Sequence, residues 1–158
     1  MIITLKDLYK LREKFKNKTI VFAGGVFDLL HIAHIRTFKK LHSYGDIVVI
    51  GIVSDKRVKE RKGKNRPILS QIERREIIDA IKYVDYVVQM PDPNKLAPIP
   101  TMSVLTKLKP DIFVSIDERW NKYKNSITNL GVQLKIVKRI HPTSTSVIIE
   151  RVIKKYKA

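Results

Sequence analysis

Two glycines and two histidines stand close together in the stretch Gly24-Gly-Val-Phe-Asp-Leu-Leu-His-Ile-Ala-His34, which follows an apolar run at residues 19–23. Glycine lets the backbone turn sharply and approach a ligand closely. A helical pattern opens at Ile32, and the start of a helix offers free N–H groups and the positive end of its dipole to a phosphate. Because histidine can donate hydrogen bonds to phosphate oxygens and carry positive charge near neutral pH, the stretch predicts a phosphate site containing His31 and His34.

Zinc binding and a purely structural role are the alternatives for a His-x-x-His pair. The chain has no cysteine, and the two other histidines, His42 and His141, stand at no ligand-like spacing. Because structural zinc sites are usually completed by four such ligands, zinc is the weaker interpretation. Two buried structural histidines explain the isolated pair better than zinc does. The choice between a phosphate site and a structural pair therefore depends on the rest of the chain.

Two more stretches carry side chains that suit phosphates. The basic stretch Val58-Lys-Glu-Arg-Lys-Gly-Lys-Asn-Arg66 is expected to be a flexible loop, and it precedes a helix opened by the capping box Ser70-Gln-Ile-Glu73. Near the C-terminus, Arg139-Ile-His-Pro-Thr-Ser-Thr-Ser146 opens a final helix, whose hydroxyl and amide groups would form a second phosphate cradle. Taken singly, solvated charges and ordinary N-capping explain both stretches.

An alternation of strands and helices must position these stretches. Apolar, β-branched runs are found at residues 19–23, 46–53, 83–89, 111–115 and 132–137. Helical patterns are found at residues 5–16, 32–42, 70–83, 102–108, 121–130 and 145–155. The alternation predicts an α/β fold: a Rossmann-like doubly wound sheet of about five parallel strands with helices on both faces. We expect residues 1–158 to form a single domain, with residues 91–100, which hold four of the seven prolines, as a surface lid or connector.

Composition limits the classes of protein that this chain can represent. It has 158 residues, 44% of them hydrophobic, with no cysteine and no long apolar run, which indicates a globular protein without disulfides or a membrane span. No signal-peptide pattern is found at the N-terminus, so a cytoplasmic location is expected. The formal charge of +17 suits polyanions such as nucleic acid or nucleotide phosphates. The basic residues are scattered, however, so a general compositional bias explains the charge better than a nucleic-acid interface.

The stretch from Gly25 to His34 resembles the signature of the cytidylyltransferase-like nucleotidyltransferases, a glycine-containing turn followed by Phe-Asp and His-x-Gly-His. The basic loop and the Ser-Thr-Ser helix start also match elements of that superfamily, in the same order, over about residues 19–153. Within the superfamily the chain is most similar to heptose-phosphate adenylyltransferases and glycerol-3-phosphate cytidylyltransferases. The Lys-Gly-x-x-Arg-Pro loop favours the first, and flavin-nucleotide-forming adenylyltransferases are a further alternative.

The resemblance implies a reaction and a set of residues for it. A nucleoside monophosphate would pass from CTP or ATP to a small phosphorylated metabolite, with Mg²⁺ held by phosphate oxygens and no metal ligand from the protein. His31, His34 and Lys62 would be catalytic. Nucleotide binding would involve Gly25, Val26, Phe27, Arg74, Asp117, Arg139, Ser144, Thr145 and Ser146. Asp117 could equally cap the next helix. The family also allows a homodimer, and no membrane partner is expected.

Two positions depart from the family pattern and keep other functions open. Ala33 replaces the usual glycine between the histidines, and Ile116 stands where glycine is usual before Asp117. These departures would suit a nucleotide-binding or regulatory domain that has lost catalysis. A basic nucleic-acid-binding module is the third alternative, and it has the least support because the chain shows no aromatic-basic array.

Overall fold

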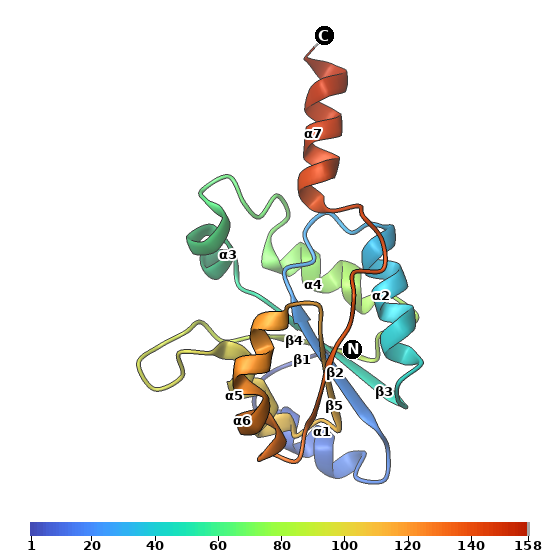
Figure 1. Cartoon of the computed structure of the whole chain (residues 1–158), viewed down its shortest axis with the longest axis vertical. Helices are drawn as coiled ribbons and strands as arrows, with labels where there is room; N and C mark the ends of the chain where they lie inside the picture. The colour runs from blue at the N-terminus through green and yellow to red at the C-terminus, as the bar shows by residue number, and fades with distance from the viewer. Residues whose placement is uncertain (158) are drawn as a thin grey trace.

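A single parallel sheet forms the centre of the molecule. The computed structural model describes residues 1–157, and its strands pair in the order β1-β4-β3-β2-β5-β6, every neighbouring pair parallel. Figure 1 shows the arrangement of strands and helices. The strands are β1 (Ile2–Ile3), β2 (Ile20–Gly25), β3 (Ile47–Ile52), β4 (Tyr86–Gln89), β5 (Ile112–Ser115) and β6 (Gln133–Ile136). The predicted doubly wound α/β fold is confirmed.

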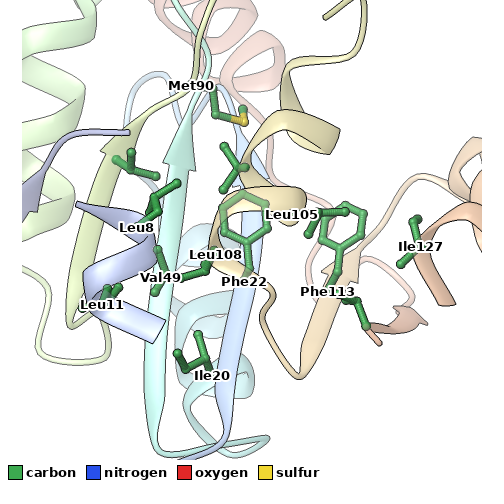
Figure 2. Packing of buried hydrophobic residues seen from close by; sticks show 13 residues of the cluster. Leu8, Leu11, Ile20, Phe22, Val49, Met90, Leu105, Leu108, Phe113 and Ile127 are labelled. Carbon is green, nitrogen blue, oxygen red and sulfur yellow. The ribbon is translucent and has the colours of Figure 1, made fainter. Parts of the chain in front are cut away.

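Helices cover both faces of the sheet. They are α1 (Leu8–Lys14), α2 (Ile32–His42), α3 (Asp55–Lys62), α4 (Gln71–Asp79), α5 (Pro100–Leu108), α6 (Lys124–Thr128) and α7 (Thr145–Tyr156), with a 3₁₀ helix η1 at Glu118–Tyr123. Because side chains alternate along a strand, β2 sends Ile20 and Phe22 into one hydrophobic core and Val21 and Ala23 into the other. Leucines of α1 and α5 belong to the first core together with Phe22, and Figure 2 shows Leu105 and Leu108 of α5 beside the Phe22 ring. Helices α2 and α4 close the second core.

Three elements differ from the sequence-based prediction. The sheet has one strand more than the five predicted, because β1 is two residues long and becomes a strand only by pairing Ile2 with Val87 of β4. The first part of the expected basic loop, residues 58–62, belongs to helix α3, which Ser54 caps by accepting a hydrogen bond from the Arg57 amide at 3.1 Å. The stretch predicted as one helix at 121–130 divides into η1 and α6. In contrast, the predicted capping box at Ser70 and Glu73 is confirmed.

The proline-rich stretch after β4 is an irregular connector. It runs from Pro91 to the start of α5 at Pro100, and Leu96 at its tip is 98% exposed. Met90 and Thr101, on either side of it, reach the main cavity described below, whereas residues 91–100 contribute no lining side chain there. Among residues 1–157, no helix is both long and apolar enough to cross a membrane.

Candidate active site

The turn between β2 and α2 contains the histidine pair and has an unusual backbone. Phe27 and Leu29 adopt left-handed conformations, with φ of 52° and 45°, which for residues with a side chain costs roughly 1–2 kcal/mol each. The predicted role of the glycines in a sharp turn is therefore wrong, because Gly25 still belongs to the extended strand. Glycine is needed at position 25 because the Phe27 ring packs against it: a Cβ on Gly25 would lie 2.7 Å from that ring.

His31 and His34 form a stacked pair at the start of α2. His31 is the N-cap residue of the helix, and the ring centroids of the two histidines lie 3.8 Å apart with an interplanar angle of 21°. The Phe27 ring meets His34 edge-on, with 5.3 Å between centroids. Within residues 1–157, the Nδ1 atoms of both histidines are buried and have no hydrogen-bond partner. Buried polar atoms normally have partners, so these two unpaired nitrogen atoms mark the histidine pair as a candidate ligand site.

Both histidines are held neutral at physiological pH. Burial, followed by the charges of His31 and Arg139, lowers the pKa of His34 to about 4. Burial, followed by Arg139 and His141, also lowers the pKa of His31 below its ordinary value. A bound polyanion would reverse the charge contribution and favour the imidazolium form. The pair can therefore take up protons as a phosphate ligand binds.

Asp28 connects the histidine turn to two other segments. Its buried carboxylate accepts hydrogen bonds from the Ile68 amide at 3.0 Å and the Leu69 amide at 3.0 Å, and it pairs with Nε of Arg66 at 2.8 Å. Its backbone carbonyl accepts the hydroxyl of Thr145, at the start of α7. Burial alone would raise the pKa of Asp28, but these donors outweigh it and hold the pKa below its ordinary value. Asp28 therefore stays ionised and fixes three segments together.

Two cations of the α3–α4 segment enter the same space. Lys62 is the last residue of α3, and burial, followed by the charges of Arg66 and Arg61, lowers its pKa. Arg66 uses Nε for Asp28, whereas its buried Nη2 has no partner among the described residues. Lys62 and Arg66 thus lie close together with unused donors. The resemblance assigned a catalytic role to Lys62 and none to Arg66. The signal that could have pointed to Arg66 is the aspartate of the Phe-Asp motif, because a buried carboxylate needs a basic partner.

Arg74 does not have the role that the resemblance implied. It is fully buried in α4 and donates hydrogen bonds to the carbonyls of Leu69 at 3.1 Å, Val53 at 2.9 Å and Val26, and to Asp55 at 2.7 Å. All of its nitrogens are used within the protein, and Arg74 is not among the cavity-lining residues of the described chain. It is a clamp that joins the ends of β2 and β3 to α3 and α4, so nucleotide contact is a wrong prediction for this structure.

The start of α7 forms the opposite wall. Ser144 is the N-cap residue and accepts a hydrogen bond from the Val147 amide at 3.3 Å, and Thr145 is tied to Asp28. The Thr145 hydroxyl is therefore committed to the fold, whereas the Ser144 hydroxyl accepts and can still donate its proton to a ligand. The first amides of a helix have no carbonyl partner inside it, so the amides of Thr145 and Ser146 are further donors that this wall can offer to an anion. Arg139 is exposed on the loop before them.

Asp117 and Trp120 lie on a third side, after β5. The Asp117 carboxylate accepts a hydrogen bond from the Arg119 amide at 3.0 Å and pairs with the Arg119 guanidinium, which holds its pKa below the ordinary value. The helix-capping alternative for Asp117 is therefore confirmed, and the residue also lines the cavity. Trp120 packs edge-on against Phe113, with 4.9 Å between ring centroids, and presents an aromatic surface to the cavity.

These parts surround one cavity of about 440 Å³. It lies where β2 ends between β3 on one side and β5 on the other, the topological switch point at which α/β sheets bind ligands. The helix starts of α2 and α7 both meet it. With the exception of Arg74, the residues that the resemblance assigned to the site all line it: His31, His34, Lys62, Gly25, Val26, Phe27, Asp117, Arg139, Ser144, Thr145 and Ser146.

The family model "Cytidylyltransferase-like" matches residues 22–155, which run from within β2 through the histidine pair to the last turn of α7. The chain belongs to the cytidylyltransferase-like family. It is 33% identical over 156 residues, 97% of this chain, to the bifunctional protein HldE of Syntrophotalea carbinolica, and 36% identical over 151 residues, 96% of this chain, to that of Campylobacter fetus. The chain spans 30% and 31% of the length of these curated relatives.

Solved structures show the same architecture. A lipopolysaccharide core biosynthesis protein from Thermoplasma volcanium is 27% identical, with a TM-score of 0.64, and the match covers 80% of this chain and 99% of that one. A pantoate-beta-alanine ligase from Francisella tularensis, complexed with beta-gamma ATP and beta-alanine, has the same TM-score of 0.64 at 17% identity and covers 100% of this chain and 78% of that one. At that identity the ligase supports the fold alone.

In this member of the cytidylyltransferase-like family, the structure accommodates Ala33 at the position where glycine is usual. It lies in the first turn of α2, is 7% exposed and lines the cavity beside the histidines. A helical backbone makes no demand for glycine, and alanine is the best helix former. The second departure, Ile116, is half exposed at the rim of the cavity. Both substitutions therefore change the lining of the site and leave its backbone intact.

Proposed function

We propose that this chain transfers a nucleoside monophosphate from ATP or CTP to a sugar phosphate or similar small phosphorylated acceptor, and releases pyrophosphate. The observation that carries the proposal is the convergence of His31, His34 and Arg66 on one cavity, each with a buried nitrogen atom that has no partner among the described residues. Lys62 and Arg139 add positive charge beside them. Membership in the cytidylyltransferase-like family supports the same reaction class.

The donors suit a triphosphate better than a single phosphate. They come from three separated segments, the α2 start, the α3–α4 segment and the α7 start, and each offers a positive charge or a helix dipole. A phosphate oxygen of the acceptor would attack the α-phosphorus of the nucleotide as the bond to the β-phosphate breaks, and pyrophosphate would leave. The acceptor phosphate is already ionised near neutral pH, so no general base is needed. Catalysis then consists of positioning and of stabilising charge in the transition state.

The residues present fit a magnesium ion that arrives with the nucleotide. No group of three or more His, Asp or Glu side chains within residues 1–157 could hold a metal, and Asp28 and Asp117 are already occupied by arginines. We propose Mg²⁺ bound by phosphate oxygens, where it would neutralise part of the developing charge. His31, His34 and Lys62 would contact the remaining phosphate oxygens.

The nature of the acceptor follows from the resemblance. The Lys-Gly-x-x-Arg-Pro loop favours the heptose-phosphate adenylyltransferases, and the curated relatives carry the name HldE. We therefore propose ATP and a sugar phosphate as the first pair to test. A cytoplasmic location stays a prediction.

The test measures pyrophosphate release with Mg²⁺ for ATP, CTP, GTP and UTP, each against sugar-, polyol- and flavin-phosphate acceptors. Mass spectrometry of the nucleotide-linked product then identifies the pair. Wild type is compared with His34→Ala and with His42→Ala, a matched control at the far end of α2. We expect one productive pair, lost in His34→Ala and kept in His42→Ala.

Other results would point to the alternatives. Tight nucleotide binding without product from any pair would contradict catalysis and favour a binding domain. Salt-dependent binding of RNA or DNA that nucleotides do not displace would favour the nucleic-acid alternative. Equal activity in the two histidine variants would overturn the site itself.

A further inference from the structure

A second cavity opens beside the active-site cavity, where β3 and β4 end. Its volume is about 440 Å³. Met90, just after β4, lines both cavities, so the two spaces share one wall. The other walls come from the starts of α3 and α4, the end of β4 and the connector that follows it, and their uncharged polar and acidic residues are Ser54, Asp55, Gln71, Gln89 and Asp92. None of these five lines the active-site cavity, and the proposed nucleotide contacts leave this space unused.

Gln89 offers this second cavity a buried oxygen atom. Its Nε2 donates hydrogen bonds to the Ile52 carbonyl at 3.0 Å and the Met90 carbonyl at 3.3 Å, which fixes the orientation of the side-chain amide. Within residues 1–157, the Oε1 atom of Gln89 is buried and has no hydrogen-bond partner. Because buried carbonyl oxygens normally have a donor, Oε1 is a candidate acceptor for a ligand that brings a hydroxyl or amino group.

The carboxylates of Asp55 and Asp92 add acceptors to the same walls. Asp55 pairs through Oδ1 with Nη2 of Arg74 at 2.7 Å, and Asp92 accepts the hydroxyl of Ser54 through Oδ1. A carboxylate has two oxygen atoms that accept hydrogen bonds, so each aspartate has a second acceptor for a ligand. Figure 1 shows α3 and the connector that holds Asp92 on the same side of the molecule.

A purely structural role explains part of this cluster. Ser54 is the N-cap residue of α3, and the Oε1 atom of Gln71 accepts a hydrogen bond from the Asp55 amide at 3.0 Å. These contacts hold the start of α3 in place. They do not explain the unsatisfied oxygen of Gln89, or the cavity that the start of α3 and the connector leave between them.

The chemistry of these walls selects hydroxyl groups. Oxygen acceptors predominate, and two carboxylates against the single cation of Lys56, whose side chain is exposed, disfavour a second anion. A metal ion is a weaker match, because no group of three or more His, Asp or Glu side chains within residues 1–157 could hold one. A neutral polyol supplies O–H donors, and hydrogen bonds to ionised acceptors are the strong ones. A locally anionic space of this kind contrasts with the formal charge of +17 on the chain.

We propose that the second cavity binds the sugar or polyol part of the acceptor, whose hydroxyl groups donate to Gln89, Asp55 and Asp92. The acceptor phosphate would lie among the cations of the active-site cavity, and the uncharged part of the same molecule would pass Met90 into the second cavity. This inference rests on the proposed function, which places the acceptor phosphate in the active-site cavity. It narrows the acceptor to phosphates whose other end carries hydroxyl groups and no negative charge.

Calorimetry with phosphates of one size tests the hydroxyl preference. The sugar probes are the 1-phosphates of α-D-glucose and α-D-mannose. Glucuronic acid 1-phosphate replaces the primary hydroxyl group of the glucose compound by a carboxylate, and cyclohexyl phosphate has no hydroxyl group. Each probe is titrated with and without α,β-methylene-ATP. Wild type should bind at least one sugar phosphate about tenfold more tightly than the other two probes, because it gains hydrogen bonds to charged acceptors and meets no like charge.

Two variants should weaken this preference in different ways. Gln89→Met keeps the length of the side chain and removes the Oε1 acceptor, so the advantage of the sugar phosphate over cyclohexyl phosphate should fall severalfold. Asp92→Asn removes a negative charge, so glucuronic acid 1-phosphate should gain affinity while the sugar phosphate loses it. Gln133→Met on β6 and Glu13→Gln on α1, both exposed, are the matched controls and should bind as wild type does. Circular dichroism and thermal melting establish that each variant is folded.

Three results would overturn the proposal. Equal affinity of wild type for the sugar phosphates and cyclohexyl phosphate contradicts the hydroxyl preference. A preference that both Gln89→Met and Asp92→Asn leave unchanged places the hydroxyl groups elsewhere. Tightest binding of glucuronic acid 1-phosphate by wild type assigns the second cavity to an anion. These titrations need no turnover, so a hydroxyl preference without pyrophosphate release would contradict the proposed reaction and not this site.

Discussion

The two walls of the cavity are built in different ways. The wall formed by the β2–α2 turn is buried, carries two left-handed residues, and is held from behind by Arg74 and Asp28 through several hydrogen bonds. The wall formed by Arg139 and the start of α7 is more exposed and is tied to the body through the hydroxyl of Thr145. The difference teaches that the histidine pair is preorganised on a rigid support, while the proposed phosphate contacts of the opposite wall depend on the hydrogen bond of Thr145.

Substitution of Arg74 should break the rigid wall and give the largest effect. Arg74→Met removes a buried cation and leaves Asp55 and three carbonyls without their donor. Loss of one partner from a buried pair typically costs about 3–5 kcal/mol, so the free energy of unfolding in urea should fall by that amount. Arg75→Met, at the neighbouring position of α4, should cost less than about 1 kcal/mol. Similar losses in both variants would contradict the clamp.

Asp28→Asn tests the one residue that belongs to both walls. The neutral amide cannot satisfy two amides and a guanidinium equally well, and hydrogen bonds to a charged group contribute about 1.5–3 kcal/mol. We expect a comparable loss of stability and a higher KM for the nucleotide. The pKa of Asp28 is lowered in the folded protein, so its contribution should be complete above about pH 4 and decline below it, as the pH falls through the folded-state pKa. Urea unfolding at several pH values should show this decline in wild type and not in Asp28→Asn.

Thr145→Val should loosen the exposed wall while the rigid wall stays intact. The variant keeps the side-chain shape and removes the hydroxyl that donates to the Asp28 carbonyl. We expect about 1–2 kcal/mol of lost stability and a severalfold higher KM for the nucleotide with a smaller change in kcat. Thr106→Val is the control, because its hydroxyl donates to the Met102 carbonyl within α5, far from the cavity. A kcat that falls more than the KM rises would show that this wall is not an independent binding element.

The pH dependence of nucleotide binding should report on the wall that contains the histidine pair. The pKa of His34 is about 4 in the free protein, and bound phosphates should raise it, so binding takes up a proton. Affinity measured by calorimetry should therefore increase as the pH falls from about 8 to about 5.5, by up to roughly tenfold per pH unit for one linked proton. The phosphates of the nucleotide titrate in the same way in the presence of His34→Asn. The difference in affinity between wild type and this variant at each pH therefore reports the contribution of His34. Parallel pH profiles would exclude a linked proton at His34.

Ala33→Gly should give the smallest effect. The residue is helical, and glycine in a helix costs at most about 1 kcal/mol relative to alanine. We expect kcat/KM to change less than about threefold, since each histidine keeps its backbone position. A wild type without activity beside an active Ala33→Gly would instead mark the methyl group as the lesion of a disabled enzyme.

The sequence by itself determined most of the fold and the location of the site. Alternating apolar runs specified the parallel sheet, the capping signal at Ser70 specified the start of α4, and the family resemblance assigned the histidine and Ser-Thr-Ser stretches to one site. These are local patterns, so they can be recognised in a single amino-acid sequence. The two-residue strand β1 and helix α3 were missed, because each depends on a distant partner or cap more than on its own periodicity.

Only the tertiary structure decided which polar residues are free to bind and which are already used. Arg66 and Arg74 look alike in the sequence, yet one keeps an unpaired nitrogen at the cavity and the other spends every donor on the fold. Thr145 likewise commits its hydroxyl to Asp28, which is 117 residues away in the chain. The physical reason is that a buried donor takes whatever acceptor lies nearest in space, and nearness between distant segments is not recorded in the order of residues.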